Sequence, residues 1–452
     1  MINLERWWFI LNQSTYDALS KLSSIEIQAL YSIYLHRCLT YKQLYKLHFL
    51  KEYELVSNFE DSILKKWIKL GLVKKVYFRH NNYVLFLTTR GVDILRIELD
   101  FPVNILNDNK QVIHRGYFRA NELEMHPRLI NHQVHLNQFV LDFKRYSTIS
   151  DKNYNTNLYN KLKYTDEKHL SSYVGIRPDG KLSLMDIDFF IEMDMSTENK
   201  SQLEEKWENY RRYLSSSSFQ SKPIENKIIV LFVIENSKDL EKRKDLVKLT
   251  ASQILLDQID NQYFDIYIGS SKELLTTIFN DILPSIEGRS VNQNNLLSTF
   301  SKEDFLISHG YNIKQRFDNI EYNYYIRKSN KDGSLKLENG RPIEFLVDDY
   351  RTKPMSILNR VDYHMKNNAL FKTFYNRDIP LLIVIDSVEK LYSDLELIDF
   401  DFDRNHLVYF SLIDEMENKT LDKCIFQLDN FGNMYRFKDY SLKTKVFFSS
   451  IK

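Results

Sequence analysis

Cysteine is scarce in this sequence, and apolar runs long enough to span a membrane are absent. Only Cys38 and Cys424 occur, nearly the whole chain apart, which argues against a disulfide framework or a cysteine-based zinc site. No run of about 18 apolar residues is present, and the first residues mix charges into an apolar stretch without a small-residue cleavage site. We therefore expect a cytoplasmic protein of a reducing compartment, without a membrane partner.

An excess of charge of one sign is also missing. The net charge is +1, so binding to a polyanion would need a local basic patch rather than the field of the whole chain. Hydrophobic residues make up 43% of the 452 residues, which is enough to bury several cores. This length predicts about two to four domains.

Helix-start patterns recur near the N-terminus. A hydroxyl residue followed three positions later by Glu or Gln satisfies the free amides of a first helical turn. The pattern occurs at Ser23/Glu26, Thr40/Gln43 and Ser57/Glu60. The third helix is predicted to run from Ser57 to Leu70 and to end at Gly71. VKKVYF and YVLFLT follow as two strands joined by a turn at 79–82. Three helices and a hairpin predict a winged helix over about Ser23–Arg96, in a domain of residues 1–98.

The third predicted helix has one basic face. At about 100° per residue, its lysines lie opposite Leu64, Trp67 and Ile68. More cations follow at the hairpin, where phosphates beside a major groove would lie, so we expect binding to double-stranded DNA without a cofactor. Lysine and arginine suit phosphates, whereas serine and asparagine suit base edges. The expected contacts are Ser57, Asn58, Ser62, Lys65, Lys66, Lys69, Lys74, Lys75, Arg79, His80, Asn81 and Asn82. The alternatives are a solvated helix face or a winged helix that contacts protein.

A second pattern begins after a segment without sustained periodicity, residues 99–127, which we interpret as a linker. Residues 128–290 are predicted to form a helix (128–146), strands near 173–175, 181–186 and 189–195, a helix near 199–214, the strand KIIVLFVIE, another helix and the strand YFDIYIG. The fold class is therefore mixed α/β. This order is similar to that of restriction-endonuclease-like domains.

The signature of such domains is an Asp after Pro, followed one strand later by an acid-x-lysine. Here Pro178-Asp179 and Glu192-Met193-Asp194 correspond to it. Glu192 and Asp194 project from the same face of a strand, so with Asp179 they form a candidate site for a divalent cation such as Mg²⁺.

A nuclease of this kind also needs a lysine beside the metal, and Asp194 occupies the expected lysine position. This departure argues against catalysis. Lys206 on the following helix is the best substitute. The candidate catalytic residues are Asp179, Glu192, Asp194 and Lys206. The alternative is a scaffold retained for binding DNA or protein, with its carboxylates hydrogen-bonded to amides or arginines.

The winged helix and the segment RPDG…FFIEMDMSTENKSQLEEKWENYRRYL together resemble the replication-relaxation family of Gram-positive plasmids and integrative elements. The resemblance covers about residues 20–280. It implies a role in plasmid or mobile-element DNA handling, such as replication or transfer. The family pattern PD…E-x-D-x-x-T…K…Y is matched by Pro178, Asp179, Glu192, Asp194, Thr197, Lys206 and Tyr210.

The C-terminal third, residues 300–452, contains no phosphate loop or nucleophile motif, but it echoes the preceding domain. EFLVDDYRT (344–352) is similar to FFIEMDMST (189–197), which sets Asp349 against Asp194 and Val347 against Glu192. We expect an αβ domain that is a degenerate second copy without a metal site. The alternative is chance similarity between two strand–helix–strand units.

Two functional hypotheses follow from these patterns. The first is a non-catalytic DNA-binding factor of a mobile element, whose further partners would be a relaxase, a replication protein or a second copy of itself. The second is a Mg²⁺-dependent DNA endonuclease. A third, lesser alternative is a transcription regulator.

Overall fold

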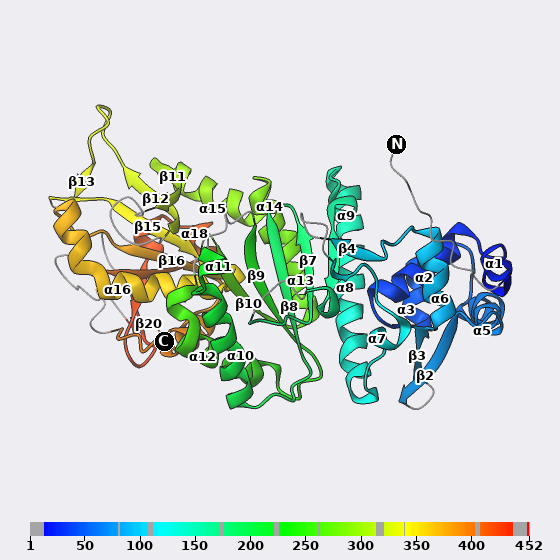
Figure 1. Cartoon of the computed structure of the whole chain (residues 1–452). Helices are drawn as coiled ribbons and strands as arrows, with labels where there is room; N and C mark the ends of the chain where they lie inside the picture. Colours follow the sequence, from blue (N-terminus) through cyan, green and yellow to red (C-terminus); the bar gives the residue numbers. More distant parts are fainter. Residues whose placement is uncertain are drawn as a thin grey trace. The chain divides into compact units, whose positions relative to one another are not determined.

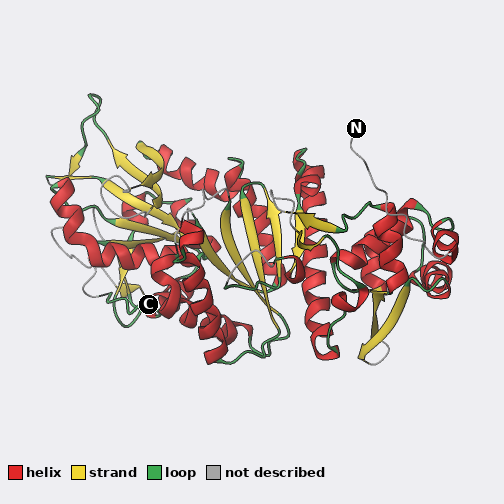
Figure 2. Ribbon diagram, in the orientation of Figure 1, coloured by secondary structure: helices red, strands yellow, loops and turns green. Residues whose placement is uncertain are grey.

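The structure is a computed structural model that describes residues 13–79, 82–106, 112–170, 175–220, 226–259, 263–312, 321–338, 340–402, 407–436 and 450–451. Helices and strands occur throughout (Figures 1 and 2), so the expected mixed α/β class is confirmed. Contacts divide the chain into unit 1, Met1–Arg145 with Tyr164–Leu170, and unit 2, Tyr146–Lys163 with Ser171–Lys452. Of the helices in the described ranges, none combines the length and apolar character needed to cross a membrane.

Unit 1 begins with helices and continues with a hairpin. Its elements are α1 Gln13–Leu19, α2 Ser24–Leu35, β1 Leu39–Thr40, α3 Tyr41–Leu44 with a π-helical turn Tyr45–Phe49, α4 Val56–Phe59, a π-helical turn Glu60–Leu64, α5 Lys65–Lys69, β2 Val73–Arg79, β3 Asn82–Leu87, α6 Thr89–Glu98, β4 Asn104–Leu106, β5 Val112–Arg115, α7 Ala120–Leu123 and the first part of α8 Pro127–Tyr154. The strands β1, β3 and β2 form one antiparallel sheet with β3 in the centre.

Capping explains where two of these helices begin. Ser23 and Thr40 each form the expected capping box, with Glu26 and Gln43 respectively. The third expected box is wrong. The helix begins at Val56 after Leu55, which offers no side-chain cap. Ser57 therefore lies inside the first turn.

The core of unit 1 is built from the inward faces of its helices and β3. Trp67 and Leu64 are fully buried, whereas Ile68, which we expected to face inward, is 40% exposed. The residues expected to be a linker contain β4, β5 and α7. The first part of α8 is tied to this unit, since Asn137 Nδ2 donates to the carbonyl oxygens of Cys38 (2.6 Å) and His36 (3.2 Å).

Unit 2 contains two αβ lobes. The first lobe has the strand order β10-β9-β8-β7, in which β7 is antiparallel to β8 and the other pairs are parallel. Every residue of β8 is buried, as expected for a strand covered on both faces. Its elements are β7 Gly180–Leu184, β8 Ile187–Asp194, α10 Lys200–Leu214, β9 Lys227–Ile234, α12 Leu240–Leu255 and β10 Phe264–Gly269. The expected strand near 173–175 falls mostly on residues outside the described ranges.

Shorter elements surround the first lobe and lead to the second. They are α9 Leu158–Lys161, α11 Ser217–Gln220, a 3-10 turn Leu256–Gln258, α13 Ser271–Thr277, a π-helical turn Ile278–Ile282, α14 Leu283–Ile286 and α15 Val291–Lys302. The strand β6 Lys163–Asp166 and a 3-10 turn Glu167–His169 fall on the segment that unit 1 includes from Tyr164 on.

The second lobe repeats the strand pattern of the first. β12 is antiparallel to β15, while β15, β16 and β17 are parallel neighbours, as β8, β9 and β10 are. The two lobes are therefore alike in the order and direction of these strands, and the expected second copy stays a prediction. The elements are β11 Phe305–Asn312, β12 Glu321–Lys328, β13 Leu337–Glu338, β14 Arg341–Pro342, β15 Glu344–Asp349, a 3-10 turn Tyr350–Thr352, α16 Met355–Tyr375, β16 Leu381–Ile385, α17 Val388–Glu396, β17 Val408–Leu412, α18 Ile413–Met416, α19 Leu421–Cys424, β18 Phe426–Leu428, β19 Met434–Arg436 and β20 Ser450–Ile451.

The two lobes share one apolar core. Phe232 and Phe264 of the first lobe belong to the same buried cluster as Leu358 and Phe410 of the second. Polar contacts join the lobes as well, since Lys248 of α12 lies 2.6 Å from Asp394 of α17. In Figure 1 α10 and α12 lie beside each other next to β8 and β9.

Candidate functional site

Helix three, defined as Val56–Lys69, turns its polar side chains outward. Phe59, Leu64 and Trp67 are fully buried and hold its other face against unit 1. An exposed polar face on an anchored helix is the arrangement that contact with a groove requires. The exposed side chains are Ser57, Asn58, Ser62, Lys65 and Lys69.

Lys66 points away from this exposed face. Its Nζ lies 2.8 Å from Oε1 of Glu26, whose side chain is only 4% exposed, and Trp67 Nε1 donates to the same oxygen at 3.0 Å. Burial alone would raise the pKa of Glu26, but the hydrogen bonds from Lys66, Ser23 and Trp67 lower it. Lys66 therefore compensates a buried carboxylate, and the expected phosphate contact would have to break that pair.

Lys65 and Lys69 are the accessible cations of helix three. Lys65 Nζ lies 2.7 Å from Asp61, but both side chains are more than 60% exposed, so the pair is weak and easily exchanged for a phosphate. Within the described residues no ion pair involves Lys69. These two lysines, rather than all three, form the basic part of the helix face.

The hairpin cations are partly neutralised. Lys74 Nζ lies 2.5 Å from Glu124, and Lys75 Nζ lies 3.4 Å from Glu60. Asn82 is exposed at the start of β3. Of the other expected contacts at the hairpin, the Arg79 side chain, His80 and Asn81 lie outside the described residues.

A buried polar cluster lies in the first lobe, where β8 meets α10. Lys206 Nζ is 2.9 Å from Glu192 Oε2 and 3.1 Å from Glu198, and the Tyr210 hydroxyl donates to Glu192 Oε1 at 2.6 Å. Asp179 Oδ2 accepts from the backbone N–H of Met193 at 2.7 Å. We call Asp179, Glu192, Lys206 and Tyr210 the Glu192 cluster.

The pKa values in the Glu192 cluster reflect burial and mutual charge. Burial raises the pKa of Glu192, with Asp179 adding to the rise and Lys206 opposing it. Burial alone would lower the pKa of Lys206, but Glu192, Glu198 and Asp179 outweigh it and raise that pKa. Lys206 therefore stays charged beside a buried carboxyl group.

Asp194 takes different partners from Glu192, although the two project from the same face of β8. Arg243 of α12 donates to both Asp194 oxygens, from Nε at 2.6 Å and from Nη2 at 2.9 Å, and the Ser196 N–H donates at 2.9 Å. Arg243 thus compensates the charge that a shared cation was expected to compensate. In the described ranges, no group of three or more His, Cys, Asp or Glu side chains is arranged to hold a metal ion.

The second lobe has a buried ion pair of its own between its strand and its helix. The sequence offset that sets Asp349 against Asp194 sets Val347 against Glu192. In the structure, however, Val347 packs in a different buried cluster from α16, so it does not take the place of Glu192. The carboxylate of β15 that contacts α16 is Asp348, whose Oδ2 accepts from Arg360 Nε at 2.7 Å, and both side chains are buried.

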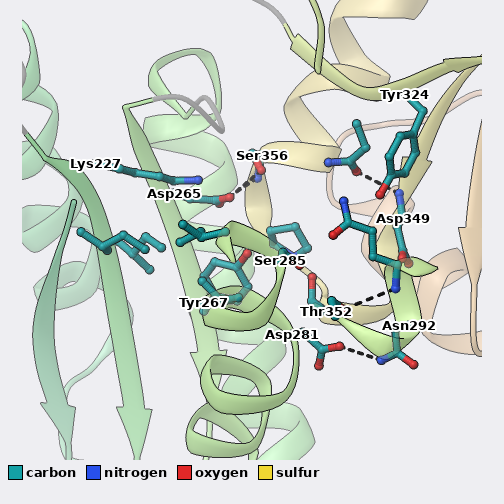
Figure 3. Close-up of a pocket in the computed structure, with 18 of the residues that line it drawn as sticks. Lys227, Asp265, Tyr267, Asp281, Ser285, Asn292, Tyr324, Asp349, Thr352 and Ser356 are labelled. Atoms are coloured by element: carbon teal, nitrogen blue, oxygen red, sulfur yellow. Dashed lines mark hydrogen bonds between the residues drawn. The ribbon is translucent and has the colours of Figure 1, made fainter. Parts of the chain in front are cut away.

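A pocket of about 450 Å³ lies between the two lobes of unit 2 (Figure 3). Asp265 in its wall accepts hydrogen bonds from the backbone N–H (3.1 Å) and the hydroxyl (2.6 Å) of Ser356 at the start of α16. In the figure the Lys227 side chain extends toward Asp265. Carboxylates outnumber cations in the lining, so the pocket is unsuited to a phosphate group. Its charged residues are Asp186, Lys227, Asp265, Asp281, Asp349 and Arg360.

These features define a mixed α/β protein with an outward-facing polar helix and two αβ lobes, the first of which contains a buried carboxylate–lysine cluster. The family model described as replication-relaxation matches residues 30–228, so this part of the chain is similar to that family. The match covers most of unit 1 and the first lobe as far as the start of β9, and it does not include the second lobe.

Two other comparisons add little. Protein SEY1 of Meyerozyma guilliermondii is 22% identical over 295 residues, which cover 58% of this chain and 32% of that protein. The chain thus spans about a third of the length of this relative, and no functional statement follows from the likeness. No solved structure matches the chain.

Proposed function

We propose that this chain is a double-stranded-DNA-binding protein of a plasmid or other mobile element, acting in its replication, its transfer or their control. The similarity of residues 30–228 to the replication-relaxation family implies a role associated with plasmid replication. In this proposal unit 1 is a winged helix, with helix three in the major groove and the β2–β3 hairpin as its wing. A relaxase, a replication protein or a second copy would be its protein partners.

The observation that carries the proposal is the outward polar face of helix three. Exposed Lys65 and Lys69 would contact phosphates, while exposed Asn58 and Ser62 would contact base edges. The Ser62 hydroxyl donates to the Asn58 carbonyl oxygen at 2.6 Å, so Ser62 would offer a base its oxygen as an acceptor. Phosphate contacts would provide affinity for any duplex, and the base contacts would provide preference among sites.

The test is duplex binding across a salt series. Each lysine–phosphate contact releases condensed counterions, so Lys65→Ala or Lys69→Ala should each lower the log–log salt slope by about 0.9 and weaken binding to all duplexes alike. Arg79→Ala should do the same if the wing contacts phosphate. Lys242→Ala, at a lysine of unit 2 whose side chain is 85% exposed, is the matched control. Wild-type binding by all three variants would reject helix three as the reader.

A second candidate is a metal-dependent nuclease, favoured by the short distance between Lys206 and Glu192. In this candidate, Lys206 on α10 would act as the lysine that such nucleases carry on the strand. Mg²⁺ would be the cofactor. The exposed fraction of the Glu192 side chain is only 4%, and Asp194 is paired with Arg243, so both carboxylates would have to exchange partners for a metal. We therefore propose that the Glu192 cluster is non-catalytic.

Supercoiled plasmid incubated with the protein and Mg²⁺ or Mn²⁺ distinguishes the two candidates. We expect no cleavage by wild-type protein. Cleavage that disappears in both Asp179→Ala and Glu192→Ala would establish the nuclease and reject the non-catalytic proposal. Urea denaturation of the same preparations shows whether the variants are folded.

A further inference from the structure

The β2–β3 hairpin carries an exposed aromatic ring with a rigid support. Tyr77 of β2 is 64% exposed, although Tyr83, its cross-strand partner, is buried. The two ring centroids are 5.6 Å apart with the ring planes at 60°, and Tyr83 in turn stacks on Tyr41 at 5.0 Å and 17°. The Tyr83 hydroxyl donates to Glu60 of helix three. Tyr77 is thus held from one edge while most of its ring meets solvent.

Two lysines flank this group of rings. Lys75 Nζ lies 4.2 Å from the centroid of the Tyr83 ring, and Lys42 Nζ lies 5.8 Å from that of Tyr41. Among the described residues, the carboxylate of Glu60 lies beside this group and already contacts Lys75 and Tyr83. A supported aromatic ring beside cations is the combination that binds a nucleic-acid base together with its phosphate.

We infer that Tyr77 is a stacking platform for an unpaired DNA base, so that the hairpin binds duplex next to a melted or single-stranded segment. The inference rests on the proposed DNA binding and adds a substrate class to it. Bases inside a paired duplex are stacked on one another and offer no free face, so Tyr77 can stack only on an unpaired base. Exposed apolar side chains are common on their own, but Tyr77 is distinguished by its supporting rings and neighbouring lysines.

The test compares a fully paired duplex with the same duplex containing a short unpaired bubble, measured by fluorescence anisotropy. Wild-type protein should bind the bubble about tenfold more tightly. Tyr77→Ala should remove this preference while affinity for the paired duplex and its salt slope stay unchanged. Tyr77→Trp should keep the preference because it keeps a stacking ring. Tyr159→Ala, at a tyrosine of unit 2 that is 47% exposed, should behave as wild type.

A fluorescent base analogue in the bubble gives a second readout, since stacking on Tyr77 should change its emission with wild-type protein and not with Tyr77→Ala. Equal wild-type affinity for the two DNAs, or a preference that survives in Tyr77→Ala, would overturn the inference while leaving duplex binding intact. Failure to bind either DNA would overturn the proposed function as well. The same variants therefore separate the two failures.

Discussion

At the residue scale, the Glu192 cluster places charges in a core where unpaired charges are costly. Lys206→Ala would leave the Glu192 carboxylate buried without its cation, and we expect the free energy of unfolding to fall by about 3–5 kcal/mol. Replacing both charged partners by apolar side chains leaves neither charge buried without a partner. Glu192→Val, Lys206→Val and Tyr210→Met together should therefore bring stability to within about 1–2 kcal/mol of wild type.

The free energy of unfolding of unit 2 in both variants is measured by urea denaturation, followed by tryptophan fluorescence or circular dichroism. The triple variant should be more stable than the single variant although it changes more residues. A triple variant as unstable as Lys206→Ala would show that the polar contacts of the cluster contribute stability that apolar side chains do not replace.

A pH effect is expected in unit 1, where two buried groups act in opposite directions. Burial raises the pKa of Asp166 from about 3.8 to about 6, so its contribution to stability is complete below pH 4 and is lost as the pH rises through 6. Burial lowers the pKa of His48 from 6.5 to about 4, so its contribution is complete above pH 6.5 and is lost as the pH falls through 4. Between pH 4 and 6.5 the two contributions partly cancel.

The substitution Asp166→Asn removes the contribution of Asp166 to stability and leaves that of His48. Stability of the variant should then fall more steeply than that of wild type as the pH drops from 6.5 to 4, by a difference on the order of 3 kcal/mol. Denaturation midpoints at several pH values in this window provide the measurement. Parallel curves for the two proteins would contradict the raised pKa of Asp166.

Some site residues could be predicted from sequence and others could not. The alternation of side chains along a strand predicted that Glu192 and Asp194 share one face of β8. Helical periodicity placed Lys206 on the following helix. Arg243 was missed because it lies on α12, and its pairing with Asp194 depends on how that helix crosses the sheet, which no local pattern encodes. The same limit applies to Lys74 and its partner Glu124.

At the scale of elements, helix three shows how a capping pattern can mislead. Ser57 and Glu60 have the spacing of a capping box, but Glu60 contacts Lys75 and Tyr83 of the hairpin instead of turning back to the backbone. The contact of Glu60 with the hairpin therefore replaces the local hydrogen bond of a capping box. The strands, by contrast, could be predicted well, because apolar runs such as KIIVLFVIE occur only where both faces of a strand are covered.

Alanine substitutions measure this difference between caps. Ser23→Ala should lower the free energy of unfolding by about 1 kcal/mol, because it removes the hydroxyl that accepts from the Glu26 N–H. Ser57→Ala should change it by less than about 0.5 kcal/mol, because Ser57 is exposed inside the first turn. Thermal or urea denaturation of both variants provides the comparison. Equal losses would indicate that Ser57 does cap helix three.

At the scale of the whole molecule, the two lobes share one apolar core, so we expect the stability of the first lobe to depend on the second. A chain ending at Gly288 would expose Phe264 and Ile266, which are buried in the cluster common to both lobes. We expect this fragment to bind a hydrophobic dye and to lack a cooperative unfolding transition. Residues 1–170 contain a core of their own and should unfold cooperatively. A dye-free, cooperative fragment 1–288 would show that the first lobe is independent.

The join between the lobes also has a consequence during synthesis. The start of α16 is hydrogen-bonded to the first lobe, where Asp265 of the edge strand β10 accepts from Ser356 and the Ile259 carbonyl oxygen before that strand accepts from Asn359. A ribosome completes β10 well before it reaches α16 and the strands around Phe410. At about 5–20 residues per second, the apolar edge of the nascent first lobe stays uncovered for roughly ten seconds. Folding in the cell should therefore depend on a chaperone that covers this edge until the second lobe emerges.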